Sequence, residues 1–197
     1  TFRQQLNEYQ KPYPWLKLGI DLLMGRQGEW KASFRDRMFL PVEMKDGLSQ
    51  TNIRREGKMI PLLANPALVL DFEPPVVKTN MLTGPFFIFG LLLIICIGLT
   101  GYFRGKKANN IIDTVIFSLF SILSVLMIFF NLFTDHQQLK SNLNIIWLSP
   151  FVILCLLSLV LKKDWRIWFR IVFFLSVGFL AFLGFLPQDI NNSFVPL

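Results

Sequence analysis

Four long apolar runs in the second half of the chain constrain its fold more than any other feature. They cover residues 82–103, 111–133, 143–161 and 167–186. A helix of about 20 residues crosses a hydrocarbon core about 30 Å thick, because each residue adds about 1.5 Å. The runs therefore predict a mostly α membrane protein with a bundle of four transmembrane helices.

The composition agrees with a membrane protein and disfavours other classes. Hydrophobic residues make up 53% of the chain and charged residues only 17%, which is outside the usual range of soluble domains. The net charge of +7 does not indicate a nucleic-acid partner, because the basic residues lie beside apolar runs and show no interleaved stacking pattern.

The short loops predict the orientation of the bundle. Basic residues gather in the first and third loops, at Arg104, Lys106, Lys107, Lys162, Lys163 and Arg166. The positive-inside rule places these loops in the cytoplasm, so the second loop and residues 1–80 are expected on the periplasmic side of an inner membrane. Four tryptophans are expected as anchors at the membrane interface: Trp15, Trp147, Trp165 and Trp168.

Residues 1–80 have a mixed pattern and little apolar sequence for a core of their own. Ser33 and Asp36 predict a helix cap, Pro41 should end or restart a helix, and Gly57 marks the turn of a short hairpin. The stretch "EPPVVKTN" is a stiff linker into the first span. We therefore expect the C-terminal part of a larger extracytoplasmic domain over 1–80, and the transmembrane bundle over 81–197.

Two details of the spans are also predicted. Asn110 is expected to cap the second helix, with Asp113 in its first turn, where a carboxylate suits the helix dipole. The third helix is expected to start near Asn144 and to bend at Pro150, because the part after the proline is too short to cross the membrane.

The second loop, "TDHQQLKSNLN" (134–144), holds the only histidine of the chain. It is either a plain connection or the floor of an outward-facing site, where the imidazole could shuttle a proton and amides could orient an ester carbonyl. The candidate substrate-pocket residues are Thr134, Asp135, His136, Asn142, Asn144, Gln188 and Asn191. One histidine and one aspartate are too few ligands for a metal site, and no cofactor is expected.

The two cysteines are not expected to act as nucleophiles. Cys96 and Cys155 both fall near the middle of an apolar run. A reactive thiolate needs an electropositive, partly hydrated setting, which hydrocarbon does not provide. No catalytic residue is therefore assigned within the chain.

Several stretches resemble the Lnb-like membrane proteins of Bacteroidota. They are "PWLKLGIDLLMG", "DRMFLPVEM", the bundle loop "TDHQQLKSNLNIIWLSP" and "LPQDINN" before "SFVPL". The resemblance implies an extracytoplasmic domain followed by about five membrane helices. It also implies lipoprotein N-acylation, in which an acyl chain from a phospholipid is transferred to the amino group of a diacylated lipoprotein.

The catalytic Cys/His motifs implied by the resemblance have no counterpart in this chain. We expect them upstream of residue 1 or in a partner chain. The chain is thus interpreted as the membrane portion of a thiol-dependent acyltransferase. The alternative is a non-catalytic membrane anchor or an assembly subunit of an envelope complex. A transporter is disfavoured, because the spans carry ionisable residues only near their ends.

Overall fold

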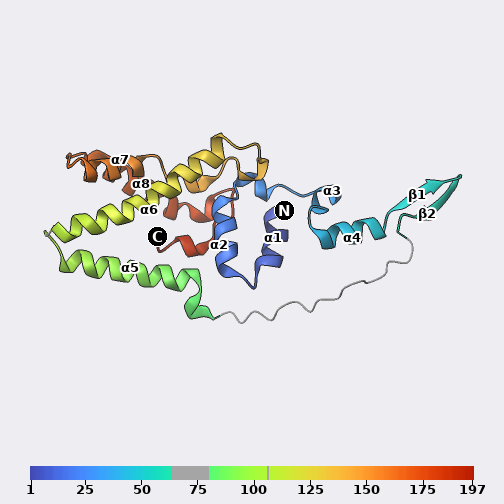
Figure 1. The fold of residues 1–197 in the computed structure, drawn as a ribbon, viewed down its shortest axis with the longest axis horizontal. Coiled ribbons are helices and arrows are strands. Elements are labelled where there is room, and N and C mark those ends of the chain that lie inside the picture. The colour runs from blue at the N-terminus through green and yellow to red at the C-terminus, as the bar shows by residue number, and fades with distance from the viewer. Residues whose placement is uncertain (64–79, 106) are drawn as a thin grey trace.

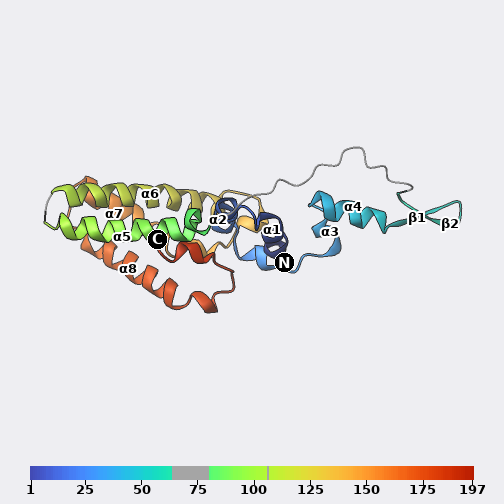
Figure 2. The same cartoon turned by 90° about the horizontal axis from the view of Figure 1, so that it is seen from below.

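The computed structural model describes residues 1–63, 80–105 and 107–197, and the molecule is elongated (Figure 1). Helices α5 to α8 lie side by side at one end, α1 and α2 lie across the middle, and α3, α4 and a hairpin project at the other end (Figures 1 and 2). The expected linker, apart from Asn80, and Lys106 of the first loop lie outside the described residues.

The N-terminal elements are short, and of these the first and third α-helices begin with a capping box while the second and fourth begin with a proline. They are α1 (Phe2–Gln10), α2 (Pro14–Leu23), the 3-10 turn η1 (Arg26–Glu29), α3 (Phe34–Arg37) and α4 (Pro41–Ser49). The predicted cap is confirmed: the Ser33 amide donates to Asp36 Oδ2 at 2.9 Å, and the Asp36 amide donates to Ser33 Oγ at 3.2 Å. Hydrogen bonding of the Asp36 carboxylate to the Ser33 side chain, and then to the Ser33 backbone N–H, lowers the pKa of Asp36 from its usual value. Pro41 starts a helix, as expected.

The predicted hairpin is also confirmed. Strands β1 (Asn52–Arg55) and β2 (Lys58–Pro61) pair antiparallel, with Arg55 opposite Lys58. The turn between them needs two residues with positive φ, which are Glu56 at 51° and Gly57 at 81°. Glycine adopts this backbone conformation without steric cost, which explains its place in the turn.

Two helices are long and apolar enough to cross a membrane. They are α5 (Pro85–Tyr102) and α6 (Lys107–Leu132), with the candidate span of α6 beginning at Ala108. Most of the large apolar side chains of α5 are exposed, which suits a helix whose surface faces lipid. The start of α6 corrects one expectation. Asn110 does not cap this helix, because α6 already begins at Lys107 and includes Asn110.

The third predicted span is wrong in its first half. Residues 143–149 form the 3-10 turn η4 (Leu143–Ile145) and irregular backbone, and α7 (Phe151–Val160) begins only after Pro150. The Asn142 side chain accepts a hydrogen bond from the Asn144 amide at 3.0 Å, which favours a turn over a helix here. With 10 residues, α7 is only about 15 Å long.

The last helix, α8 (Arg166–Ala181), is followed by two 3-10 turns, η5 (Leu183–Phe185) and η6 (Asn192–Phe194). A further 3-10 turn, η3 (Gln137–Leu139), and η2 (Met81–Thr83) complete the described elements. We call the end formed by residues 133–149 and 186–194 the polar end of the bundle. The opposite end, with Arg104, Lys162, Lys163 and Arg166, is the basic end.

One apolar core joins the N-terminal helices to the bundle. Leu18 of α2 packs in the same cluster as Met127 of α6, Leu148 and Phe179 of α8. Trp147 belongs to this cluster and is 9% exposed, so its side chain packs against protein, and its role as an interface anchor stays a prediction. Its indole is held inside because its N–H donates to the Asn144 side chain at 3.0 Å.

The other three tryptophans that were expected as anchors lie nearer the surface. Trp15 donates its indole N–H to the Thr83 carbonyl at 2.9 Å and lies edge-on against Phe89 of α5. Trp168 stacks on Phe151 at 5.6 Å between ring centroids, and Trp165 lies beside Lys163 at the basic end. Their role as interface anchors stays a prediction.

Candidate functional site

A buried carboxylate of α2 organises the polar end of the bundle. Asp21 is 2% exposed and accepts from Arg3 Nη1 at 2.8 Å, from Lys17 Nζ at 2.6 Å and from Asn191 Nδ2 at 2.8 Å. Arg3 is itself buried and also pairs with Glu29. Because both oxygens of Asp21 are paired, its charge can remain inside the protein. Lys17 and Asp21 are four residues apart, a spacing that brings their side chains together on one face of a helix.

Three side-chain amides bind the end of the same helix. Asn142 donates to the Leu22 and Leu23 carbonyls at 2.7 and 3.0 Å, and Asn144 donates to the Leu22 carbonyl at 3.1 Å. Gln188 donates to the Met24 carbonyl at 3.1 Å. The last carbonyls of a helix have no partner within it, so these amides supply the missing donors from the bundle.

The amides also bind one another. Gln188 Nε2 donates to Asn142 Oδ1 at 3.1 Å, and Gln188 Oε1 accepts from the Leu143 amide at 2.8 Å. The backbone N–H of Asn142 donates to Asn131 Oδ1 of α6 at 2.8 Å. We call the whole group the polar seam: Arg3, Lys17, Asp21, Asn142, Asn144, Gln188 and Asn191. It fixes α1 and α2 to the polar end of the bundle.

The structure thus brings together four of the seven candidate residues, namely Asn142, Asn144, Gln188 and Asn191. Their side chains bond α2 or its end, and Gln188 also lines a hollow at the rim of the polar end. Arg3 and the buried state of Asp21 were missed by sequence reasoning. The available signal was a carboxylate inside the apolar stretch "WLKLGIDLL", where a solvated side chain is unusual.

The remaining three candidates lie apart from the seam. The Thr134 hydroxyl donates to the Phe130 carbonyl at 3.1 Å, so it supplies a partner to a carbonyl in the last turn of α6. Asp135 and His136 are exposed, and within the described part of the chain their side chains make no hydrogen bond or ion pair. A role for His136 in turnover stays a prediction, and turnover by His136→Ala in the full-length protein tests it.

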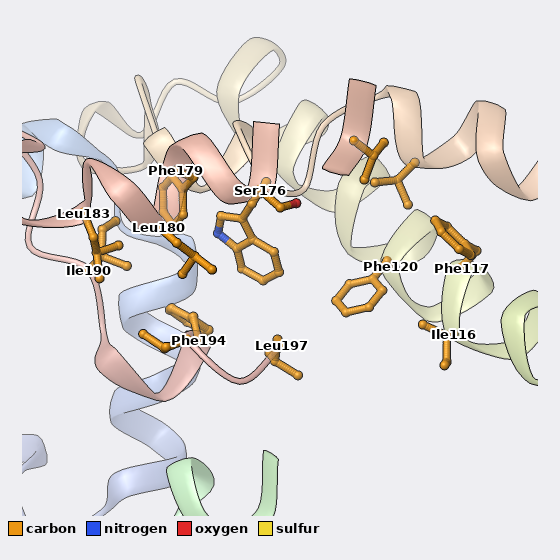
Figure 3. A pocket seen from close by; sticks show the side chains of 14 residues that line it. Ile116, Phe117, Phe120, Ser176, Phe179, Leu180, Leu183, Ile190, Phe194 and Leu197 are labelled. Atoms are coloured by element: carbon orange, nitrogen blue, oxygen red, sulfur yellow. The ribbon is translucent and has the colours of Figure 1, made fainter. Parts of the chain in front are cut away.

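An apolar pocket of about 220 Å³ lies in the bundle below the polar seam. Its walls come from α6, α8, Val152 of α7 and the segment after α8. Figure 3 shows it as an elongated space, with Ile116 and Phe117 at one end and Leu183 and Ile190 at the other. Trp147 also lines it, so one side chain connects the pocket to the polar seam through Asn144.

A second hollow lies at the rim of the polar end. It measures about 430 Å³, and its polar lining residues are Glu29, Gln188, Asp189 and Asn192. It shares Leu183 and Ile190 with the apolar pocket. The Asp189 amide donates to Glu29 Oε1 at 3.1 Å, which joins the rim to the N-terminal segment.

The thiols lie away from these hollows. Cys155 is buried in α7 and Cys96 is partly exposed on α5. Among the described residues, no three His, Cys, Asp or Glu side chains group as metal ligands do. The chemistry that the arrangement supports directly is therefore the binding of an amphiphilic molecule.

Comparison with known proteins identifies the second part of the chain. The model of the Lnb transmembrane domain matches residues 77–197, which is more than half of the chain. No curated protein and no solved structure matches the chain. The matched range includes helices α5 to α8 and every residue that lines the apolar pocket, and the chain belongs to the family of the Lnb transmembrane domain.

Proposed function

We propose that the chain is the membrane portion of a lipoprotein N-acyltransferase. It presents lipid substrate to a thiol site in the extracytoplasmic domain, for acyl transfer to the amino terminus of a lipidated cysteine. The observation that supports this most is the apolar pocket directly beneath the polar seam. A lipid chain can stay in the pocket while its polar end reaches the rim, where residues 1–30 are docked.

The proposed chemistry takes two balanced steps. The thiolate attacks the ester carbonyl of a phospholipid, which forms a thioester and releases the lipid hydroxyl after it takes up a proton. The amine of the acceptor then attacks the thioester, forms an amide and regenerates the thiol. The bundle contributes by holding the lipid in place, and a correctly oriented reactant lowers the barrier of both steps.

The polar seam supports a fixed distance between the bundle and the outer domain. Its amide contacts hold α2 on the bundle, and the ion pair between Arg3 and Asp21 ties α1 to α2. A loose tether would not keep a membrane-bound ester within reach of a thiol outside the membrane. In this proposal the polar end faces the periplasm, and the basic end faces the cytoplasm.

The second candidate function is a membrane anchor or assembly subunit without a role in catalysis. The polar seam alone would serve such an anchor, because it docks the N-terminal segment on the bundle. The apolar pocket distinguishes the two functions, since an anchor has no need of a space for lipid.

The test is an acyl-transfer assay on the full-length protein with a diacylated lipopeptide as acceptor. Ser176 lines the pocket, and Ser176→Phe should fill it and lower turnover at least about tenfold, as expected when a substrate is misplaced. Val177→Phe is the control. Val177 follows Ser176 in the sequence, but its side chain is 46% exposed and does not line the pocket. Full turnover by Ser176→Phe would favour the anchor, and no product from wild type would refute the enzyme.

A further inference from the structure

The apolar pocket and the rim hollow adjoin along one wall. Both are lined by Leu183 and Ile190, which lie on either side of the Pro187–Asp189 bend after α8. Figure 3 places these two residues at one end of the apolar pocket, opposite Ile116 and Phe117. The two hollows therefore fit a single elongated molecule with an apolar chain and a polar end.

The apolar part is suited to a hydrocarbon chain. Ser176 is its only hydroxyl-bearing lining residue, and all other lining side chains are apolar or aromatic. An apolar protein cavity of roughly 150 Å³ stays free of water and binds benzene-sized molecules. A space of about 220 Å³ inside a membrane domain is therefore expected to take up part of an acyl chain rather than water.

The charge at the rim selects the polar end of that molecule. Glu29 and Asp189 line the rim hollow, and among the described residues that line it none is basic. Arg3 is buried, and its guanidinium forms ion pairs with both Glu29 and Asp21. Within the described part of the chain Asp189 makes no ion pair. An ammonium group is thus favoured at the rim, and an anionic phosphate is disfavoured.

We propose that the two hollows form one site for the lipidated amino terminus of the acceptor. One acyl chain lies between α6 and α8, and the α-ammonium group of the modified cysteine lies beside Asp189 and Glu29. This inference rests on the proposed function, and it assigns the site to the acceptor and not to the phospholipid donor. A molecule with a free amine at the end of a lipid anchor fits both hollows, because its acyl chain suits the apolar pocket and its ammonium group suits the acidic rim.

Binding to the full-length protein in detergent tests the proposal. The probes are a dipalmitoylated cysteinyl peptide with a free amine and the same peptide with an acetylated amine. We expect the free amine to bind about five- to tenfold more tightly, as for a partly exposed charge-assisted contact. Asp189→Lys should abolish this preference. Asp46→Lys, which changes an exposed carboxylate of α4, should keep it.

The chain-binding part has its own control. Ser176→Phe should weaken binding of both peptides by at least about tenfold, and Val177→Phe should leave both unchanged. A photoreactive group on the acyl chain should crosslink to α6 or α8. Crosslinking elsewhere, or a transmembrane helix seated between α6 and α8 in a structure of the full-length protein, would overturn the proposal.

Competition decides between acceptor and donor. Phosphatidylglycerol and phosphatidylethanolamine should both compete poorly with the free-amine peptide, because each brings a phosphate to the acidic rim. Equal binding of the two peptides, or displacement by either phospholipid at equal concentration, would refute the assignment. If acyl transfer is intact but binding ignores Asp189, only this inference fails. If binding discriminates but no transfer occurs, the site stands and the proposed enzyme fails.

Discussion

At the scale of single residues, buried polar side chains determine how α2 docks on the bundle. Asn142 and Asn144 are 1% and 0% exposed, and each bonds backbone atoms far away in sequence. Sequence reasoning named these asparagines as candidate pocket residues, and a role in a substrate site stays a prediction. Their partners are carbonyls of α2, and no local pattern tells which distant helix end an amide will bind.

Asn144→Ala should lower stability by about 1–3 kcal/mol, because it leaves the buried Trp147 indole N–H without a partner and removes one of the two donors to the Leu22 carbonyl. Thermal unfolding of the purified protein in detergent measures the change. Asn110→Ala is the control, since Asn110 is exposed on α6 and should tolerate the change. Equal melting temperatures for both variants would show that the seam contributes nothing to stability.

Asp21→Asn should be more damaging than the loss of an amide. The change keeps the size of the side chain but removes the negative charge that faces buried Arg3 at 2.8 Å. Breaking a buried pair from one side costs roughly 3–5 kcal/mol, and Glu29 should keep the loss near the lower limit. Denaturant unfolding compares it with Asp46→Asn. A loss no larger than that of the exposed control would contradict a central role for Asp21.

At the scale of elements, predictability depends on whether a helix is specified locally. Helices α5 and α6 followed from length and hydropathy alone, because a continuous apolar run needs only its own backbone hydrogen bonds to cross a membrane. Residues 143–149 failed the same test. Their irregular backbone is stabilised by Asn142, Asn144 and the buried Leu148, and these contacts exist only after the chain has folded.

The contact between α6 and α7 provides a test that hydropathy alone would answer wrongly. Ser124 is 0% exposed and donates to the Ser149 carbonyl at 3.1 Å. Ser124→Leu makes the run more apolar, yet overpacking the interface should cost about 1–3 kcal/mol. Ser124→Ala should cost only about 0.6 kcal/mol, the typical value of a hydrogen bond between membrane helices. Steric trapping or unfolding in mixed micelles ranks the two variants, and a stabilised Ser124→Leu would show that α6 and α7 pack less closely.

At the scale of the whole molecule, packing groups the chain differently from composition. The change in composition near residue 80 suggested a boundary there, but α2 shares the core and the polar seam with the bundle, α1 joins the seam through Arg3, and η1 contacts the segment after α8 through Glu29. Helices α3 and α4 and the hairpin project beyond this body (Figure 2). The sequence could indicate the membrane bundle and its family, whereas the two adjoining hollows depend on the path of the chain after α8.

The orientation of the whole molecule in the membrane is the broadest prediction. The basic residues at one end of the bundle predict that this end is cytoplasmic, and that α1, α2 and the 134–142 loop lie in the periplasm. In a variant lacking Cys96 and Cys155, Gln137→Cys should react with a membrane-impermeant maleimide in intact cells whose outer membrane is permeabilised. Lys162→Cys should react only after lysis. Both positions are exposed, so differences in labelling report the membrane side and not burial. The reverse pattern would place the rim hollow in the cytoplasm, and it would contradict the proposed access to a periplasmic lipoprotein.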